Sequence, residues 1–322
     1  MTLHDIRRLI AEDFAAVDRT IRARLTSDVA LVEKVGQYIV AGGGKRLRPI
    51  LVLLAARACG YRGDRHVLLA AVVEFIHTAT LLHDDVVDAS TLRRGRETAN
   101  AVFGNAASVL VGDFLYSRAF QMMVEAGDFE IMRVMADATN AIAAGEVMQL
   151  MNCHDPDVSE ERYLAVIERK TAKLFEAGAE IAALVAGAAP AQRAALARYG
   201  LQIGKAFQLV DDVLDYGADS AELGKNVGDD LAEGKPTLPL IQAMKAGDER
   251  QRRLIREAIE RGDRARLTAV LDAIRATGAL DYTRAAARRE AALARAELDV
   301  LPDSPYRQAL AALADIAVER DR

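Results

Sequence analysis

The feature of this sequence that most restricts its fold is the absence of proline from residues 50–155, between Pro49 and Pro156. Proline interrupts a helix because it lacks a backbone N–H and its ring clashes with the preceding turn. The chain is rich in Ala, Leu, Glu and Arg, which favour the helix, and it lacks runs with the alternating apolar pattern of strands. The sequence therefore predicts an all-α fold built from long helices.

Apolar patterning and the remaining prolines and glycines divide the chain into the expected helices. They span residues 4–23, 28–40, 49–59, 65–88, 106–125, 128–152, 159–187, 190–217, 236–246, 248–261, 264–277, 279–299 and 304–320, with ends predicted to within about four residues. The helix at 65–88 is apolar nearly all round, which is typical of the buried centre of a bundle. No Pro- or Ser-rich linker and no low-complexity segment divides the chain, so we expect one domain over residues 1–322.

Composition excludes several classes of protein. The net charge of −5 does not favour a nucleic-acid partner, and Cys59 and Cys153 have no metal or redox spacing, which fits a reducing cytosol. The N-terminal residues include acids throughout, unlike a signal or transit peptide, and no apolar run approaches the ~18 residues of a membrane span. We expect a soluble, cytoplasmic protein, and apolar surface on two faces of a central helix favours a homodimer.

Two acidic segments share the pattern D-D-x-x-D, and each follows an apolar run. The segments are LLHDDVVD at 81–88 and FQLVDDVLDY at 207–216, and their aspartates are Asp84, Asp85, Asp88, Asp211, Asp212 and Asp215. Carboxylates four residues apart repel one another on a helix, and a helix C-terminus destabilises them further. One copy is equally compatible with a solvated helix end, whereas two copies favour a cavity mouth where hard cations bridge the carboxylates. Oxygen ligands favour Mg²⁺ over zinc, and Mg²⁺ commonly completes its shell with phosphate.

Basic residues lie near both acidic segments. AGGGKRLRP at 41–49 places Lys45, Arg46 and Arg48 between a glycine run and a helix start, where backbone and charge suit an anion. LRRGRETAN at 92–100 and LGKNVGDDLAEGKPTLP at 223–239 each follow an acidic segment, and their basic residues are Arg93, Arg94, Arg96, Lys225 and Lys235. For the glycine-rich segment at 41–49 the alternative is an ordinary loop, and for the arginines of 92–100 the alternative is a surface ion-pair network. The pattern predicts a phosphate or diphosphate ligand.

Four further polar residues lie on apolar helices. They are Lys170 and Thr171 in the middle of the helix at 159–187, Gln208 three residues before Asp211, and His77 before the first acidic segment. For Lys170 the alternative is a side chain that extends to the surface. For Gln208 and His77 the alternative is an ordinary hydrogen bond in the core.

These motifs, in this order, resemble those of the trans-polyprenyl diphosphate synthases. The matching blocks are GGGKRLRP, LLHDDVVD with RRG, ERKTAKL, FQLVDDVLDY and GKNVGDDLAEGKPTLP, across residues 40–240, and the likeness is strongest to long-chain bacterial members. The resemblance implies that the metal ligands are Asp84, Asp88, Asp211 and Asp215, supported by Asp85 and Asp212. It implies that an allylic diphosphate is neutralised by Arg93, Lys170, Lys225 and Lys235. It also implies that the diphosphate of isopentenyl diphosphate is held by Lys45, Arg48, His77 and Arg94, with Thr171 and Gln208 beside the reacting carbons.

The resemblance also implies a fold, a reaction and partners. The fold is a single-domain orthogonal helical bundle of the isoprenoid synthase type, with a central cavity lined by long helices. About three Mg²⁺ ions per site, replaceable by Mn²⁺, would assist ionisation of an allylic diphosphate such as farnesyl diphosphate. Isopentenyl diphosphate attacks the cation, a proton is lost, and the cycle repeats. The product would be an all-trans octaprenyl diphosphate for quinone side chains, made by a homodimer that associates loosely with membranes through that product.

Product length depends on the depth of the pocket upstream of Asp84. Ala79, Thr80 and Ile76 are expected to line its wall, and Ala79 leaves a gap where an aromatic ring would form a floor. Six of the eight methionines lie in residues 122–151, and as a group, with Met123 and Met135 in particular, they are candidates for a soft tunnel wall. The alternative for any one of them is gap-filling in the core. The sequence leaves the product open between heptaprenyl and decaprenyl, together with the primer, the dimer geometry and the quinone pathway.

Other protein classes explain less of the sequence. A shorter-chain prenyl diphosphate synthase remains an alternative. An HD-type metal-dependent phosphohydrolase would explain His83 beside Asp84, but it needs further histidines, and the five in this chain form no suitable pattern. A terpene cyclase has no use for a second diphosphate site, and a non-catalytic subunit or a purely structural helical protein has no need of both acidic motifs.

Overall fold

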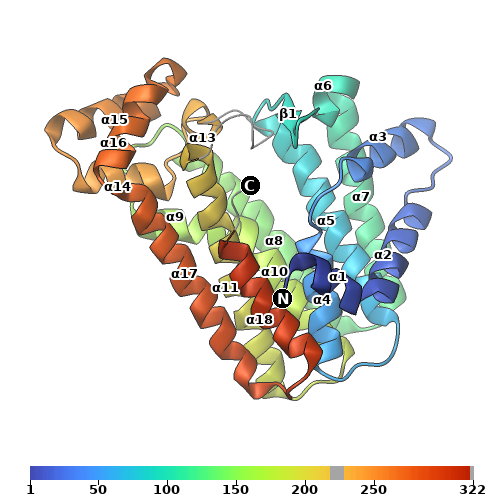
Figure 1. Cartoon of the computed structure of the whole chain (residues 1–322). Coiled ribbons are helices and arrows are strands. Elements are labelled where there is room, and N and C mark those ends of the chain that lie inside the picture. The colour runs from blue at the N-terminus through green and yellow to red at the C-terminus, as the bar shows by residue number, and fades with distance from the viewer. Residues whose placement is uncertain (218–227, 320–322) are drawn as a thin grey trace. The chain divides into compact units, whose positions relative to one another are not determined.

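The computed structural model describes residues 1–217 and 228–319, and these residues are almost entirely helical, as the sequence predicts. The helices are labelled in Figure 1, and by their contacts the described residues divide into two compact units. Unit 1 contains Met1–Thr139, Leu174–Gly200 and Arg295–Leu313, and unit 2 contains Asn140–Lys173, Leu201–Ala294 and Ala314–Arg322. The boundaries fall inside helices rather than in linkers. The single domain expected from the sequence stays a prediction.

Unit 1 is organised around the long helix α5 (Arg65–Val87). The helices that pack against it include α2 (Ala11–Arg24), α4 (Leu47–Ala58), α6 (Ala99–Phe103) and α7 (Asn105–Ala126). The unit also contains α1 (Leu3–Leu9), α3 (Ala30–Ala41), the first part of α8 (Phe129–Asn152), most of α10 (Lys173–Val185), the start of α11 (Pro190–Gly217), η3 (Leu298–Val300) and most of α18 (Pro305–Val318). Because α4 is apolar on every side, residues 50–56 are buried without a break.

Helix α5 corrects one expectation from the sequence. By length and composition this helix is apolar enough to cross a membrane, so the statement that no apolar run approaches that length is wrong for Arg65–Val87. In the fold, 67% of its most apolar window is buried. Its apolar surface is therefore covered by protein, as expected for the core helix of a bundle.

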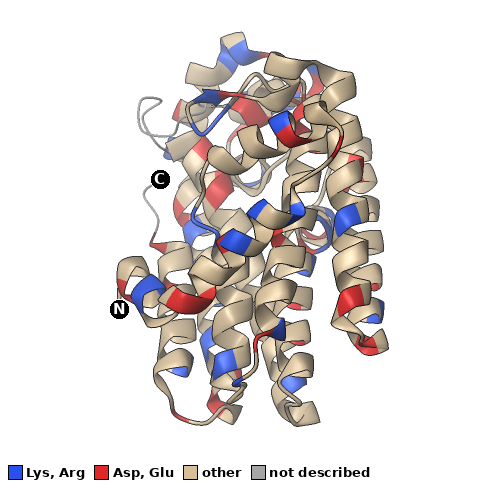
Figure 2. Ribbon diagram, turned by 90° about the vertical axis from the view of Figure 1, so that its right-hand side faces the viewer, with Lys and Arg blue, Asp and Glu red and all other residues tan. Residues whose placement is uncertain are grey.

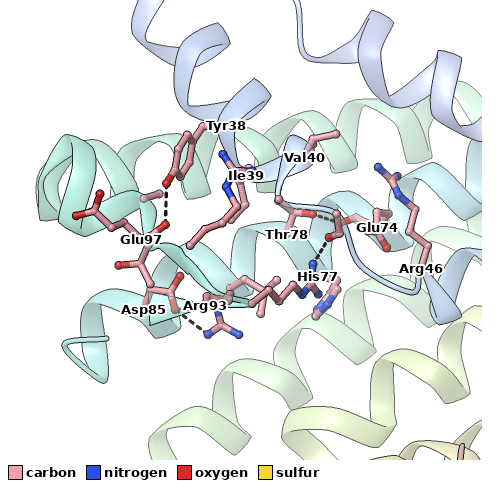
Figure 3. Close-up of a pocket in the computed structure, with 17 residues that line it drawn as sticks. Tyr38, Ile39, Val40, Arg46, Glu74, His77, Thr78, Asp85, Arg93 and Glu97 are labelled. Atoms are coloured by element: carbon pink, nitrogen blue, oxygen red, sulfur yellow. Dashed lines mark hydrogen bonds and ion pairs between the residues drawn. The ribbon is translucent and has the colours of Figure 1, made fainter. Parts of the chain in front are cut away.

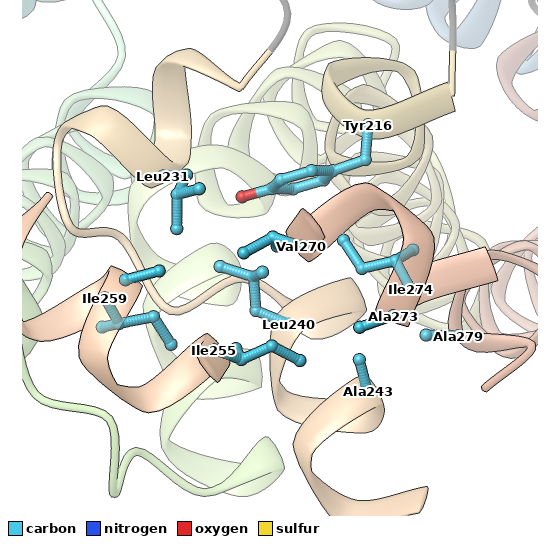
Figure 4. Close-up of a cluster of buried hydrophobic side chains, with 11 residues drawn as sticks. Tyr216, Leu231, Leu240, Ala243, Ile255, Ile259, Val270, Ala273, Ile274 and Ala279 are labelled. Atoms are coloured by element: carbon cyan, nitrogen blue, oxygen red, sulfur yellow. The ribbon is translucent and has the colours of Figure 1, made fainter. Parts of the chain in front are cut away.

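Unit 2 has its own hydrophobic core. Its elements are the second part of α8, α9 (Glu160–Ile167), a π turn η1 (Glu168–Ala172), most of α11, α13 (Asp229–Ala232), α14 (Leu238–Ala246), α15 (Glu249–Arg261), η2 (Arg264–Arg266), α16 (Leu267–Ala276) and most of α17 (Ala279–Glu297). Tyr216 of α11 and Leu240 of α14 pack with Ile255 and Ile274 of the following helices (Figure 4). This cluster fixes the C-terminal end of α11, where the second acidic motif lies.

Most of the expected helices are confirmed, with ends that agree within two residues. The helix expected at 4–23 is instead two helices, interrupted at Ile10 (φ −114, ψ 26), where no glycine or proline marks the break. The helix expected at 159–187 contains the π turn Glu168–Ala172. The short helices α6 and α13 lie outside the ranges expected to be helical.

The expected absence of strands is wrong for one short segment. Leu92–Arg93 (β1) pairs antiparallel with Arg96–Glu97 (β2) across Arg94 (φ 55) and Gly95 (φ 73). Two consecutive residues with positive φ are typical of the tight hairpin turn whose twist matches that of paired strands. Strands of two residues are too short to show an alternating pattern. The basic loop after the first acidic motif is therefore a hairpin.

Charged residues are interspersed along the helices, and acidic and basic stretches are not segregated from each other (Figure 2). Among the described residues, two carboxylates stand apart because they are buried, Asp85 with 0% of its surface exposed and Asp212 with 2%. Burial of a charged group costs free energy unless partners compensate it. Each of the two residues is the second aspartate of its D-D-x-x-D motif.

Candidate functional site

The first acidic motif forms the C-terminal end of α5. Asp88 is the C-cap, its N–H donating to the Asp84 carbonyl at 2.8 Å, and Ala89 then turns the chain with φ 49. The side chains of Asp84 and Asp88 are partly exposed, whereas Asp85 is buried. The two outer carboxylates therefore remain accessible at the negative end of the helix dipole, which favours a bound cation.

Asp85 is paired with Arg93 of the hairpin. Nε and Nη2 of Arg93 donate to Asp85 Oδ1 at 2.9 and 2.7 Å (Figure 3). Asp85 Oδ2 is buried and accepts no hydrogen bond from the described residues. Arg93 is thus the counter-ion that makes burial of Asp85 tolerable. Its expected role at the allylic diphosphate stays a prediction.

Three polar side chains that sequence reasoning missed hold the end of α5. Asn100 Nδ2 donates to the carbonyls of Asp85 and Ser90, each at 3.1 Å, and Thr98 Oγ1 donates to the Ser90 carbonyl at 2.7 Å. Ser108 Oγ of α7 donates to the Leu82 carbonyl at 2.8 Å. These bonds satisfy carbonyls that a helix end leaves without partners. Asn, Thr and Ser are too common in helices and their flanking residues to have indicated this role.

A pocket in unit 1 is lined by His77 and Arg94, two of the four residues expected to bind isopentenyl diphosphate. Its lining also includes Arg46 and Glu74, which Figure 3 labels beside His77, and Gly43. Nη1 of Arg48 lies 3.2 Å from His77 Nε2. The guanidinium of Arg48 is fixed over the Phe175 ring at 4.3 Å, and Arg94 Nη1 donates to the Gly43 carbonyl.

Electrostatics in this pocket favour an anion. Burial, with further contributions from Arg48 and Arg94, lowers the pKa of His77 well below its usual value, so the ring is neutral near pH 7. Burial raises the pKa of Glu74, although neighbouring arginines oppose that shift. The pocket therefore has arginine charge in excess of carboxylate charge.

The glycine run before Lys45 makes a close backbone approach possible. Gly44 has φ 143, and a Cβ on it would lie 2.6 Å from Nη1 of Arg94. Any side chain at this position would therefore displace Arg94 as well as strain the backbone. The guanidinium of Arg7 donates to the Lys45 carbonyl at 3.0 Å and holds the other end of the loop.

The second acidic motif lies at the end of α11 in unit 2. Tyr163 Oη donates to Asp212 Oδ2 at 2.5 Å, and Gln208 Nε2 donates to Asp212 Oδ1 at 2.8 Å. Burial, reinforced by the nearby Asp230 carboxylate, raises the pKa of Asp212 well above its usual value. Both Asp212 oxygens thus have protein donors, while Asp211 and Asp215 are partly exposed. As in the first motif, one carboxylate points inward and two stay accessible.

Lys170 and Thr171 lie in the π turn η1, which widens the helix locally; such turns are frequent at functional sites. Nζ of Lys170 lies 2.6 Å from Glu146 Oε2 and donates to Gln149 Oε1 at 2.7 Å, both residues being on α8. The Lys170 side chain is only 17% exposed, so it does not extend into solvent. Thr171 Oγ1 donates to Gln208 Oε1 at 2.9 Å. Unit 2 therefore brings Thr171, Gln208 and Asp212 into one hydrogen-bonded chain.

The basic loop after the second motif is described only in part. Lys235 is 9% exposed, its Nζ lies 2.5 Å from Glu233 Oε2, and its N–H donates to the Asp230 carbonyl at 2.8 Å. Lys225 lies outside the described residues. Among the described residues no three His, Cys, Asp or Glu side chains form a ready metal-binding group. The facing of the two acidic motifs across one cavity stays a prediction.

The residues expected to control product length are buried in unit 1. Ala79 and Ile76 of α5, Met123 of α7 and Met135 of α8 are fully buried, whereas Thr80 is partly exposed and its Oγ1 donates to the His77 carbonyl at 2.8 Å. Met151 is 73% exposed, so it does not belong to a buried wall, and this part of the methionine hypothesis is wrong.

Comparison with known proteins decides the family. The family model described as polyprenyl synthetase matches residues 29–275 of the chain. The chain belongs to the polyprenyl synthetase family. It is 58% identical over 323 aligned residues to an octaprenyl diphosphate synthase from Escherichia coli (strain K12), with 100% of both chains covered.

Solved structures of polyprenyl synthetases share the fold. A polyprenyl synthase from Caulobacter crescentus CB15, crystallised in complex with calcium and isoprenyl diphosphate, has a TM-score of 0.97 and 46% identity, with 100% of this chain and 98% of that chain covered. A decaprenyl diphosphate synthase from Rhodobacter capsulatus has a TM-score of 0.93 and 47% identity, with both chains fully covered. Membership of the polyprenyl synthetase family decides against the HD-type phosphohydrolase and the purely structural protein.

Proposed function

We propose that this polyprenyl synthetase elongates an allylic diphosphate, farnesyl diphosphate, with isopentenyl diphosphate to all-trans octaprenyl diphosphate, a precursor of quinone side chains. The observation that supports this most strongly is full-length similarity to an octaprenyl diphosphate synthase at 58% identity. All the motif residues that the reaction requires are present in the chain. We expect the enzyme in the cytoplasm, with loose membrane association through its product.

The donors of the two acidic motifs fit Mg²⁺. Asp84 and Asp88 are accessible at the end of α5, and Asp211 and Asp215 are accessible on α11. Mg²⁺ is usually bound through one or two carboxylates, with water and substrate phosphates as its other ligands. When bound, Mg²⁺ or its substitute Mn²⁺ would neutralise the charge that develops on the departing diphosphate.

Unit 1 would bind isopentenyl diphosphate in its basic pocket. Arg48 and Arg94 are held by contacts with Phe175 and the Gly43 carbonyl, so little conformational entropy is lost when they bind an anion. Neutral His77 supplies a further donor next to Arg48. Lys45 completes the set of cations expected at this diphosphate.

Unit 2 would stabilise the allylic cation and the departing diphosphate. Lys170, held by Glu146 and Gln149, and Lys235 are the described cations expected at that diphosphate. The oxygens of Thr171 and Gln208 are dipoles whose negative ends stabilise a cation without forming a bond to it. The double bond of isopentenyl diphosphate attacks this cation and forms the new carbon–carbon bond. A proton is then lost, and the departed diphosphate is the base to which we assign its removal.

The proposed product length rests on α5 and its neighbours. Ala79 is five residues before Asp84, which places it ~7.5 Å further along the helix axis. Its methyl group is small, and Ile76 and Met123, which are also expected to line the wall, are buried and apolar. A growing chain therefore meets no aromatic floor at this depth.

We also propose that the enzyme is a homodimer. Leu110 and Val124 of α7 are 66% and 61% exposed and lie 14 residues apart, close to one face of the helix. Exposed apolar residues along one helix face favour burial against a partner. Sedimentation velocity tests this, with Leu110→Glu and Val124→Glu together expected to yield monomers.

The reaction is tested by incubating the protein with farnesyl diphosphate, radiolabelled isopentenyl diphosphate and Mg²⁺, and sizing the products by chromatography. Octaprenyl diphosphate is expected, and product formation should stop with EDTA and resume with added Mg²⁺. The Asp84→Asn, Asp88→Asn double variant should lose at least about a hundredfold in rate while keeping its helical circular dichroism. A wild-type protein that forms no elongated product would overturn the proposed function.

A further inference from the structure

Tyr163 is a buried residue that the proposed reaction leaves without a role. It lies on α9, 5% exposed, and its hydroxyl donates to Asp212 Oδ2. Tyrosine is bulky, and phenylalanine would fill the same apolar space in the cluster around Ile167 and Leu209. A hydroxyl at this depth therefore points to a requirement for its hydrogen bond.

The bond from Tyr163 is one of three consecutive hydrogen bonds, in which Asp212 accepts from both of its neighbours. Asp212 accepts from Tyr163 at Oδ2 and from the Gln208 amide at Oδ1, and Gln208 Oε1 in turn accepts from Thr171 Oγ1 at 2.9 Å. The elements linked in this way are α9, α11 and the π turn η1. All four residues belong to unit 2.

The chemistry of the groups sets which partner donates in each bond. Both Asp212 oxygens accept in this structure, Oδ2 from Tyr163 and Oδ1 from the NH₂ group of Gln208, so the amide oxygen of Gln208 faces the opposite side. An amide oxygen also only accepts, so the Thr171 hydroxyl must donate its single proton to Gln208. With that proton committed, Thr171 Oγ1 has only lone pairs to present to any other neighbour.

We propose that Tyr163 is a positioning residue for prenyl transfer: through Asp212 and Gln208 it orients the Thr171 hydroxyl so that its oxygen faces the allylic cation as an acceptor. Tyr163 fixes the Asp212 carboxylate from the side opposite Gln208. Without it, Asp212 is free to rotate, Gln208 is free to flip its amide, and Thr171 no longer has a fixed dipole. A dipole stabilises developing charge most when it is oriented before the reaction.

This inference rests on the proposed function and adds to it a residue outside the recognised motifs. Its test is Tyr163→Phe, measured as the first condensation of farnesyl diphosphate with radiolabelled isopentenyl diphosphate over hours, so that slow variants are still quantified. We expect kcat to fall about tenfold, within the range that ~1 Å of misplacement produces, and KM for both substrates to change less than about twofold. Tyr282→Phe is the matched control, because Tyr282 Oη also donates to a carboxylate, Glu160, at 3.0 Å, and this bond lies outside the chain of three.

A double-mutant cycle distinguishes positioning of the Thr171 hydroxyl by Tyr163 from a general loss of rigidity in unit 2. In a Thr171→Val background the dipole is already lost, so Tyr163→Phe should change kcat by less than about twofold there. An equal tenfold loss in both backgrounds would overturn the inference, as would a Tyr163→Phe enzyme that matches Tyr282→Phe. An inactive wild-type protein would instead refute the proposed function, so the two failures are distinguishable.

Discussion

Gly145 on α8 offers a sharp test of how the π turn is positioned. A Cβ on Gly145 would lie 2.6 Å from the backbone nitrogen of Lys170, 2.9 Å from Arg169 Cβ and 3.0 Å from Lys170 Cα. Two of these three atoms belong to the backbone, so no rotation of a side chain can relieve the contact. The change Gly145→Ala therefore pushes α8 away from the segment that holds Lys170 and Thr171.

Two opposing effects set the size of the change. Alanine is better than glycine in a helix by about 1 kcal/mol, whereas overpacking costs about 1–3 kcal/mol. The free energy of unfolding should therefore fall by no more than about 2 kcal/mol. To restore ordinary contact the neighbouring backbone must move by most of an ångström, and a shift of ~1 Å in a positioned group can lower the rate about a hundredfold. Activity should thus fall much more than stability.

The assay is kcat for the first condensation, with urea denaturation of the same samples for stability. Gly217→Ala is the control in the same unit, because the nearest atom to its added Cβ, Arg284 Nη2, is at an ordinary 3.5 Å. We expect at least about a tenfold loss of kcat for Gly145→Ala and less than about twofold for Gly217→Ala. Equal rates for the two variants would refute the argument that close packing of α8 positions the π turn.

Three further predictions concern unit 1. Ala79→Tyr places a ring in a fully buried position on α5 and should shorten the product towards farnesyl length, as sized by chromatography; an unchanged product would show that this helix does not line the tunnel. Arg93→Met leaves the buried Asp85 carboxylate without its counter-ion and should lower the free energy of unfolding in urea by about 3 kcal/mol, whereas Arg96→Met, which lacks that carboxylate contact, should have little effect. The pKa of His77 is lowered by burial and by Arg48, so below pH ~6.5 the unfolded chain binds a proton that the folded chain does not. The free energy of unfolding should therefore fall as pH decreases from ~6.5 towards the pKa of His77 in the folded chain. His77→Gln should reduce the slope of the free energy of unfolding against pH by up to about 1.4 kcal/mol per pH unit, and an unchanged slope would contradict the lowered pKa.

The helices of this protein could be predicted because their signals are local. Proline placement and apolar periodicity depend only on neighbouring residues, and the observed ends agree within two residues for most of the chain. The break at Ile10 and the π turn at Glu168–Ala172 could not be predicted, because no glycine or proline marks either. The hairpin around Arg94 and Gly95 was missed for a different reason, since two-residue strands are shorter than any pattern that would reveal them.

The candidate site was predictable to the level of residue types. Repeated carboxylates followed by basic loops indicated metal and diphosphate, because few other ligands require that combination. Which carboxylates are accessible was not predictable from the pattern. The buried Asp85 and Asp212 are the same residue type as the partly exposed aspartates beside them. Burial distinguishes them, and burial is a property of packing.

The sequence by itself determined the helical architecture, the two acidic motifs and the family, because these depend on local composition and on residues at fixed spacing. Only the tertiary structure decided how each motif divides into inner and outer carboxylates, and which residues hold them. Arg93 and Asn100 reach Asp85 from a hairpin and a short helix, and Tyr163 reaches Asp212 across 49 positions of the chain. Such partners come from elements that meet only after packing, so no spacing within the sequence records them.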